Sequence, residues 1–565
     1  MIFASFLNWM FSVFLLSVML GNIIAGKQSK LAVYSFGFFI FLGANWAYFL
    51  IKYFDFWFDP FALSLFSAIL FLYTLRVSGI SFFRELARDF GIVSLILFPL
   101  YLSFGDVFVA WDALASWNRW AKEIFNGEYI FSGTAYPVLV SSIVALVYEF
   151  QSTDSVNFTT KFSLIMIPVF FLLIAKADQN NPKIFISLCI IFFNFLTNKG
   201  VLSGEADFPV SIAGLVVLYL CFISNIKSDI KYSAIALLIA GPVCLLKQSG
   251  LPFFCFAFIN FLYLFLTIDI GYIKRERSLL IWSLILSSSF PISFYFLNFM
   301  FTGSLTSNLS YLVGLSAQAS VLDIFNRYFD NPRPQLDFIM IPFSLFAFYA
   351  LLRKVSDDIR FFVLVSGVFF VLGSFFWIYA FSYDSRNAVW AKSFALFTLV
   401  IYLSEARFVE RVRRFCVRHQ RLWDITGLSL STGGLCLLGY LCLWGQTTAE
   451  NFQRRGELEI GPVDAALELS YLLGSDESER CPYLVTNDLL IRHNFYLKSY
   501  AAKILDVPAS IESLLSDEVP KCVNGGFFYF GSWSKNDPTW HLLTEKVDTG
   551  EILSVDPDLG VYRRP

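Results

Sequence analysis

The chain has 565 residues, of which 57% are hydrophobic and 15% are charged, and its formal net charge is −2. A soluble globular protein carries roughly 25% charged residues, so this composition excludes an ordinary soluble domain and favours a protein embedded in a lipid bilayer. The near-neutral balance of charge gives no reason to expect a nucleic-acid partner.

Apolar segments of about 20 residues recur from the N-terminus to about residue 446, and this is the length at which an α-helix crosses the hydrocarbon core. We expect membrane spans near residues 3–24, 31–52, 60–76, 91–105, 161–176, 183–198, 208–224, 232–247, 251–271, 279–302, 338–353, 361–382, 391–404 and 425–446. The pattern therefore predicts an α-helical polytopic membrane domain over residues 1–446 with about fourteen transmembrane helices. The first segment is too long for a signal peptide and lacks its basic flank, so we interpret it as a span.

Basic residues in short connections orient the chain, because such loops stay on the cytoplasmic side. The largest group comprises Arg407, Arg411, Arg413, Arg414, Arg418 and Arg421, and smaller groups lie at residues 76–88, 274–277 and 353–360. Alternation from these loops places residues 106–160, 199–207, 303–337, 383–390 and the tail outside. The apolar run at 136–150 breaks the alternation if it spans, so we expect a half-buried or re-entrant helix on the outer face.

The segment 447–565 is polar and mixed in character. Strand-like runs at 483–486, 527–530 and 560–563 alternate with helix-like stretches, which predicts a small C-terminal extracytoplasmic α/β domain. Of nine cysteines, Cys481 and Cys522 fall in this segment. An oxidising compartment favours a disulfide between them, and the alternative is two buried free thiols.

Two acids follow the fourth predicted span, at Asp106 and Asp112. The stretch after them has helical spacing: one face holds Ala113, Trp117, Trp120 and Ile124, and the other holds Asp112, Ser116, Arg119 and Glu123. Tryptophans opposite charges are typical of a helix in the membrane interface. Asp112 is then a candidate catalytic carboxylate near the mouth of a cavity between spans. The alternative for Asp112 is a helix N-cap, and Asp106 is expected to be a structural or supporting acid.

A second outer loop carries Glu205 and Asp207 directly before a span. Acids at a membrane edge cost free energy unless they are paired or used. We expect them to position an acceptor hydroxyl or to hold a divalent cation. Helix capping is the alternative, because Asp207 precedes Pro209 at the first turn.

Three basic residues lie at outer span ends, namely Lys247, Arg386 and Lys392. The positive-inside tendency makes cations there less expected. A lipid phosphate or pyrophosphate is one reason for their presence, since Arg can bind it through two parallel hydrogen bonds. The alternatives are snorkelling to the interface and pairing of Arg386 with Asp384.

Together these motifs, in this order and on one side, resemble the GT-C superfamily of membrane glycosyltransferases. The form Trp111-Asp112-Ala113…Trp117-Asn118…Tyr136-Pro137 is similar to bacterial relatives of the dolichyl-phosphate-mannose protein mannosyltransferases and of the lipid A aminoarabinose transferase. In many of those relatives the tyrosine–proline pair follows His-Pro, whereas here it follows Gly133-Thr134-Ala135.

Three further elements of the resemblance lie later in the chain. The stretch 204–209 resembles a second acidic loop, often Gly-Tyr-Ala-Asp-x-Pro. Lys247-Gln248-Ser249-Gly250 resembles a Lys-x-Glu-Gly element in which Ser249 replaces the acid, and Ser385-Arg386-Asn387 resembles an Arg-Tyr segment before a late span. The resemblance covers about residues 100–400.

The resemblance implies a GT-C-like fold and an inverting transfer of a sugar from a polyprenyl-phosphate donor to a glycan, lipid or protein acceptor. It implies that Asp112 is the catalytic base, and that Arg386, Lys247 and Lys392 contact the donor phosphate. Glu205, Asp207 and Asp106 then position the acceptor or a divalent cation, and metal dependence stays open. The expected location is a bacterial inner membrane, with the C-terminal domain in the periplasm.

Other functions stay open at this point. A ligase or polymerase of lipid-linked oligosaccharides also works on the outer face and relies on large arginine-rich loops. A transporter or flippase favours charges at mid-span and repeated halves, neither of which the sequence shows. A non-catalytic scaffold would place the function in the C-terminal segment. The sequence has no nucleotide-binding loop and no His/Cys cluster with zinc spacing.

Overall fold

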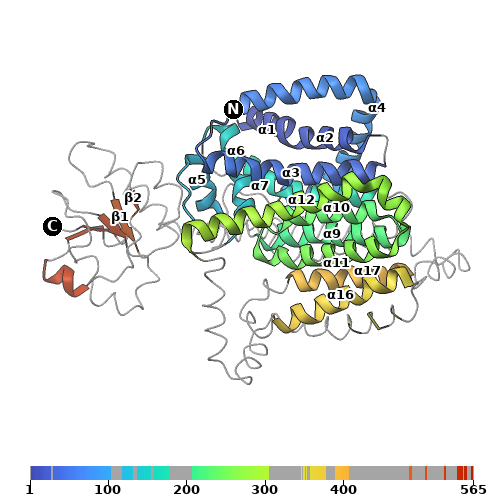
Figure 1. Cartoon of the computed structure of the whole chain (residues 1–565). Helices are drawn as coiled ribbons and strands as arrows, with labels where there is room; N and C mark the ends of the chain where they lie inside the picture. The colour runs from blue at the N-terminus through green and yellow to red at the C-terminus, as the bar shows by residue number, and fades with distance from the viewer. Residues whose placement is uncertain are drawn as a thin grey trace, which may run out of the picture.

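The computed structural model describes residues 2–26, 29–102, 117–131, 136–153, 158–177, 206–303, 357–376 and 389–405, with shorter pieces at 345, 348–349, 352, 483–486, 503–504, 527–529, 544–550, 553–556 and 561–563. The described part of the chain is mainly a bundle of long α-helices (Figure 1). Six of these helices are long and apolar enough to cross a membrane, and four shorter apolar helices accompany them. The chain is therefore a multi-pass α-helical membrane protein.

The helices follow the apolar segments of the sequence. In chain order they are α1 (Ile2–Trp9), continued through a π-helical turn (Met10–Leu15) into α2 (Leu16–Ala25), α3 (Lys30–Tyr53), α4 (Pro60–Leu102), α5 (Arg119–Asn126), α6 (Leu139–Gln151), α7 (Phe158–Ala177), α9 (Asp207–Lys227), α10 (Ile230–Val243), α11 (Leu251–Thr267), α12 (Ile270–Thr302), α16 (Asp357–Phe376) and α17 (Val389–Glu405). The predicted spans at 183–198 and 425–446, and most of 338–353, lie outside the described residues.

The two segments predicted at 60–76 and 91–105 are joined into one long helix, α4. The helix breaks at Gly79, whose φ of 72° lies in the region that only glycine adopts readily. The break divides α4 into a first segment and a second segment, and the basic residues that the sequence assigned to a cytoplasmic loop lie on both sides of it.

The core of the bundle surrounds α9. In the most apolar window of α9, 94% of the residues are buried, compared with 11% in α4. A helix that is apolar on all sides is expected either at the centre of a bundle or against lipid. The structure assigns α9 to the first case and α4, at the edge of the bundle in Figure 1, to the second.

Small residues allow close contact between neighbouring helices. A Cβ added at Gly21 of α2 would overlap the Val33 carbonyl of α3, and one added at Gly241 of α10 would overlap the backbone at Ser287 of α12. Glycine at such contacts lets backbones approach, which is how transmembrane helices gain packing without a hydrophobic driving force.

Hydrogen bonds between helices bring together the ends that the sequence assigned to one side. At the predicted outer side, Ser64 at the start of α4 donates to Asn8 of α1 over 2.8 Å. At the predicted inner side, Asn22 donates to Ser78 over 2.8 Å. The hydroxyl of Tyr272 in α12 likewise donates to Asp229, the N-cap of α10, over 2.6 Å. These three contacts therefore join helix ends that the predicted alternation places on the same side.

Helix α6 covers most of the apolar run at 136–150, which would break the predicted alternation of sides if it spanned the membrane. It has 13 residues, so its length is about 20 Å, whereas the hydrocarbon core is about 30 Å thick. Twelve of the 13 side chains are buried in the protein. Its length and burial agree with a partial helix, and its position on the outer face stays a prediction.

Five short strands lie in the C-terminal segment: β1 (Tyr483–Thr486), β2 (Lys503–Ile504), β3 (Phe527–Tyr529), β4 (Leu553–Asp556) and β5 (Val561–Arg563). Their order is β2-β1-β3-β5-β4. The pairs of β1 with β2 and β3 are parallel, and those of β5 with β3 and β4 are antiparallel. Strands β1, β3 and β5 coincide with the three predicted runs. That residues 447–565 form a separate domain stays a prediction.

Candidate functional site

The predicted site residues divide into two groups. Asp207, Lys247 and Lys392 lie in the described helices or at their ends. The others, namely Asp106, Asp112, Glu205, Arg386, Cys481 and Cys522, lie outside the described residues.

Asp207 and Lys247 form an ion pair at the predicted outer end of the bundle. Lys247 Nζ lies 2.6 Å from Oδ1 and 2.8 Å from Oδ2 of Asp207, so both carboxylate oxygens accept from one ammonium group. The side chains of Lys247 and Asp207 are only 15% and 11% exposed. The sequence assigned these two residues to different substrates, and the structure brings them into direct contact.

Local structure explains how the pair forms. Asp207 begins α9, where a negative charge also favours the positive end of the helix dipole. Lys247 follows α10 in extended backbone with φ −164°, immediately before the turn that leads into α11. Ala206 is the N-cap of α9 and Asp207 is its first residue, so Asp207 is not itself the N-cap.

The first outer loop meets the same place. The backbone N–H of Leu139, at the start of α6, donates to the carbonyl of Leu245 over 2.9 Å. Leu245 lies two residues before Lys247 in the sequence. The Tyr136-Pro137 motif and the Lys247 motif, which the sequence separates by more than a hundred residues, are therefore neighbours in space.

An aromatic cluster lies beside this junction. The rings of Trp117 and Trp120 are 5.2 Å apart and edge-on, and Tyr136 lies 6.1 and 6.2 Å from them. Ser141 of α6 donates to the Trp117 carbonyl over 2.8 Å. The tryptophan face was predicted to lie in the membrane interface, and the structure instead buries it against Tyr136 and α6.

The opposite face of α5 carries charge, as the spacing predicted. Arg119 and Glu123 form an ion pair one turn apart, at 2.6 Å. Lys122, which the sequence pattern gave no reason to select, is almost fully buried on α5. Helical spacing places Lys122 away from the apolar face, so its burial could not be predicted from the pattern, although a buried cation must be paired or used.

A second polar contact fixes α6 to α3. The hydroxyl of Tyr48 donates to Glu149 over 3.0 Å, and Lys52 lies 3.0 Å from the same carboxylate. Both partners on α3 lie near its predicted outer end. The half-length helix is therefore held by side chains as well as by its buried surface.

Lys392 lies at the same end of the bundle as Lys247. It occupies the first turn of α17, two residues before Phe394. The ring of Phe394 stacks on that of Phe253, at the start of α11, with centroids 5.2 Å apart. Because α11 begins just after Lys247, two of the predicted phosphate-binding cations approach one end of the bundle.

Within the helices and strands that the structure describes, no group of three or more His, Cys, Asp and Glu is placed to hold a metal ion. Of the acids predicted to position an acceptor or a cation, Asp207 alone belongs to those ranges. A single carboxylate bound by a lysine is not a metal site. Metal dependence therefore stays open, as in the sequence analysis.

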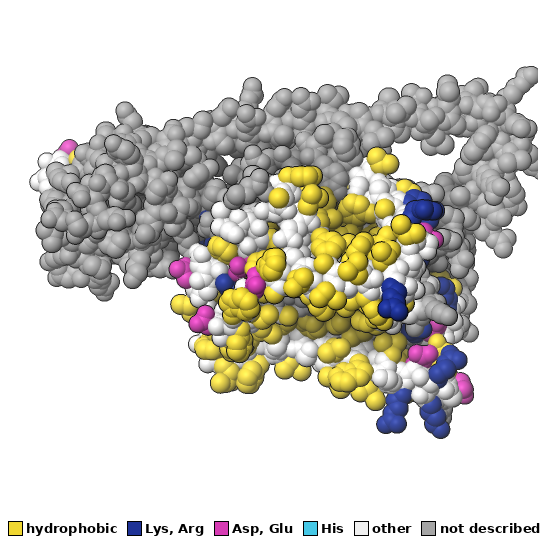
Figure 2. Space-filling model, turned by 90° about the horizontal axis from the view of Figure 1, so that it is seen from above, with side chains coloured by type: hydrophobic (Ala, Val, Ile, Leu, Met, Phe, Trp, Pro, Cys, Tyr) yellow, Lys and Arg dark blue, Asp and Glu magenta, His cyan; other side chains and the backbone are white. Residues whose placement is uncertain are grey.

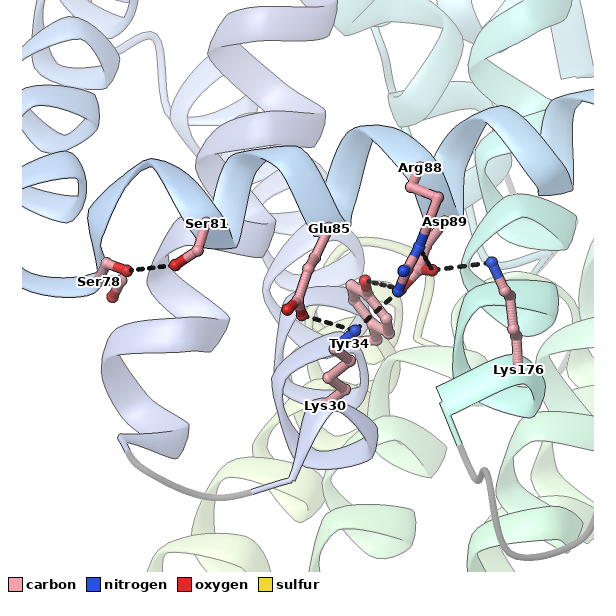
Figure 3. Close-up of polar contacts among 8 residues, drawn as sticks. All are labelled: Lys30, Tyr34, Ser78, Ser81, Glu85, Arg88, Asp89 and Lys176. Carbon is pink, nitrogen blue, oxygen red and sulfur yellow. Dashed lines mark hydrogen bonds and ion pairs between the residues drawn. The ribbon is translucent and has the colours of Figure 1, made fainter.

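A polar cluster that the sequence analysis did not single out lies at the opposite, predicted inner end (Figure 3). The buried Asp89 of α4 accepts from Lys176 of α7 over 2.8 Å and from the Tyr34 hydroxyl of α3 over 3.0 Å. Lys30 lies 3.6 Å from Asp89 and 2.7 Å from Glu85. The signal in the sequence was an acid next to an apolar segment, where acids are rarely found without a partner.

Comparison of the chain with protein-family models, with curated proteins and with solved structures finds no match. The resemblance to the GT-C superfamily therefore rests on the short motifs and on their order along the chain.

Proposed function

We propose that the chain is an inverting glycosyltransferase, which moves a sugar from a polyprenyl-phosphate donor to an acceptor hydroxyl at the outer face of the membrane. The observation that carries the proposal is the junction at the outer end of the bundle. Motifs from the first loop, the second loop and the Lys247 turn, which resemble elements of one family site, meet there around the Asp207–Lys247 pair.

The proposed reaction begins at Asp112, which accepts the proton of the acceptor hydroxyl. The hydroxyl oxygen forms a bond to the anomeric carbon from the face opposite the phosphate. The bond between that carbon and the phosphate oxygen breaks, and the lipid phosphate leaves with the electron pair. Cations placed at the leaving phosphate stabilise its charge most strongly where water is excluded.

Lys247 is the described cation best placed for that role. Its ammonium group is already shielded from water and is held by a carboxylate. A phosphate entering the site would compete with Asp207 for Lys247 and release the carboxylate toward the acceptor. Arg386 and Lys392 complete the proposed phosphate site, and Glu205 and Asp106 support the acceptor or a divalent cation.

The wider architecture is part of the same proposal. We infer about fourteen transmembrane helices in residues 1–446 and a C-terminal α/β domain in residues 447–565. The proposed location is a bacterial inner membrane, with that domain in the periplasm and a disulfide between Cys481 and Cys522. The sheet formed by β1–β5 supports the α/β character of the tail.

The proposal is tested in the native host after deletion of the gene. Wild type, Asp112→Asn and Asp55→Asn are restored separately at equal membrane levels, and envelope glycans are profiled by mass spectrometry. Asp55 is an exposed acid in the connection between the second and third predicted spans, and its backbone has φ 55°, which asparagine tolerates. It serves as the matched control for the loss of one negative charge.

We expect one sugar-sized mass to disappear in the deletion strain and to return with wild type and with Asp55→Asn. With Asp112→Asn it should stay absent, because the acceptor hydroxyl then has no base. Full restoration by Asp112→Asn would remove the catalytic assignment. An unchanged glycan profile in the deletion strain would remove the proposed function as a whole.

A further inference from the structure

We propose that the surface of α4 around its break at Gly79 binds the headgroups of anionic phospholipids. The surface is defined by Arg76, Arg84 and Arg88, with the apolar side chains beside them. This binding is separate from glycosyl transfer, because the surface lies at the end of the bundle opposite the Asp207–Lys247 pair.

The arginines of this surface are exposed. Arg76 precedes the break by three residues and Arg84 follows it by five. Neither has an ion-pair or hydrogen-bond partner within the part of the chain that the structure describes. Arg88 is 62% exposed, and its contact is a 3.6 Å approach to the neighbouring Asp89.

The acids on the same segment are already neutralised from within the bundle. Lys30 of α3 lies 2.7 Å from Glu85, and Lys176 of α7 donates to Asp89 over 2.8 Å (Figure 3). The second segment of α4 runs across the start of α3 and the end of α7 in that view. Lysines of α3 and α7 thus bind the acids of α4, and Arg76 and Arg84 keep their charge for a partner outside the chain.

The chemistry of the surroundings points to a lipid. The side chains of Leu72, Val77 and Ile80 are all exposed on α4, next to the arginines in the sequence. In Figure 2, hydrophobic side chains cover the middle of the visible face, and most of the visible Lys and Arg side chains gather at one end. A phospholipid fits such a surface, because its phosphate can contact the arginines while its acyl chains contact the apolar side chains.

Arginine suits the phosphate of such a lipid. Its planar guanidinium donates two parallel hydrogen bonds to phosphate oxygens, and it is less strongly hydrated than lysine. A soluble phosphate would match the charges and leave the apolar side chains in water. The combination therefore favours an anionic phospholipid over a free anion.

The test uses the purified full chain and native mass spectrometry. Phosphatidylglycerol and phosphatidylcholine with identical acyl chains are offered to wild type, to Arg76→Gln/Arg84→Gln and to Lys274→Gln/Arg277→Gln. The last variant removes the same charge from α12, where Lys274 and Arg277 are also exposed. Arg76→Lys/Arg84→Lys, which keeps the charge, shows whether the arginine geometry matters.

We expect wild type to retain phosphatidylglycerol about tenfold better than phosphatidylcholine, from the usual attraction of basic residues to anionic lipids. Arg76→Gln/Arg84→Gln should lower this preference to about twofold, whereas the α12 variant should keep most of it. If the double variant fails to fold, Arg84→Gln alone should give an intermediate preference. Millimolar inorganic phosphate should not displace the bound lipid.

Three results would overturn the proposal. The first is equal retention of both lipids by wild type. The second is an equal loss of preference in the α4 and α12 variants, which would show a general effect of net charge. The third is displacement of the lipid by inorganic phosphate, which would show a site for free anions.

Discussion

At the predicted outer end of the bundle, one lysine and one aspartate form an enclosed pair, whereas at the predicted inner end one aspartate is shared by several cations. Lys247 donates to both carboxylate oxygens of Asp207 over short distances. Asp89 accepts from Lys176 and Tyr34 and also has Lys30 nearby.

The difference separates two uses of buried charge in a membrane protein. A carboxylate bound by one described lysine can be released by a substrate that carries its own negative charge, because that charge can replace the carboxylate at the ammonium group. A carboxylate with donors from two other helices, α3 and α7, is over-determined, and losing any one donor leaves the others in place. The first arrangement suits a reacting site, and the second suits a fixed connection between α3, α4 and α7.

The largest expected effect is at the outer pair. Lys247→Gln should lower sugar transfer by about 100-fold, the usual cost of removing one group that stabilises a leaving charge. Lys176→Gln, the matched change at the inner end, should stay within about threefold at equal membrane levels, since the proposed reaction does not use it. The measurement is the glycan profile of the complemented deletion strain.

A charge swap distinguishes the chemical role of Lys247 from a structural one. Asp207→Lys/Lys247→Asp restores opposite charges at the outer end and should recover the thermal stability of the protein. Transfer should stay low, because the ammonium group is then displaced from the proposed phosphate position. If thermal stability and sugar transfer both recovered in this variant, the role of the pair would be purely structural.

The inner cluster should dominate stability. Asp89→Asn leaves Lys30 and Lys176 without their shared carboxylate and should cost about 3 kcal/mol, as for other buried pairs that lose one partner. Glu85→Gln should cost less than about 1 kcal/mol, because the Glu85 side chain is 48% exposed. Thermal unfolding in detergent compares them, and equal shifts in Tm would contradict the assignment of Asp89 as the central group.

A smaller effect on stability is expected when glycine is replaced by alanine, and it should differ between α2 and α4. Gly21→Ala should destabilise the protein by about 2 kcal/mol, because the added Cβ meets backbone atoms of α3 that cannot turn away. Gly91→Ala in α4 meets nothing within 4 Å and should be neutral or stabilising by up to about 1 kcal/mol. Tm values of the two variants would be compared, and a loss at Gly91 would show that α4 is covered.

The smallest effect concerns pH at the outer end. Burial, with a further contribution from Glu123, raises the pKa of the Tyr129 phenol above its ordinary value of about 10. Its stabilising contribution is therefore complete below pH 10 and falls as the pH rises above it, by less than about 1 kcal/mol at pH 10.5. Tyr129→Phe should make Tm less steep between pH 9 and 11, and an unchanged slope would exclude this assignment.

Much of the fold was predictable because hydropathy is a local property. Spans such as α3, α9 and α12 follow directly from runs of apolar residues long enough to cross the bilayer. That α6 is shorter than a span was expected from the alternation of loops between the two sides of the membrane. The two faces of α5 were expected from the helical spacing of its residues. Strands β1, β3 and β5 followed from short apolar runs in a polar segment.

The site was predictable only in part. The sequence identified Asp207 and Lys247 as unusual charges at span ends, and it assigned them to different partners. It overlooked Asp89, which lies between a predicted cytoplasmic loop and a predicted span, and Lys122, which helical spacing places away from the apolar face of its helix. The two expected spans at 60–76 and 91–105 form one helix, α4, which is interrupted at the backbone of Gly79. The spacing of apolar residues along the sequence does not reveal this interruption.

The sequence by itself identified most of the segments that form the described helices and the ends of them that carry charge, because the length of an apolar run and the polarity of its flanking residues are local properties. Only the tertiary structure decided which charges meet. Asp207 and Lys247 are 40 residues apart, and Asp89 and Lys176 are 87 apart. Such contacts depend on the packing of α9 against α10 and of α4 against α7, which follows from the shapes of many side chains at once and from no single pattern along the chain.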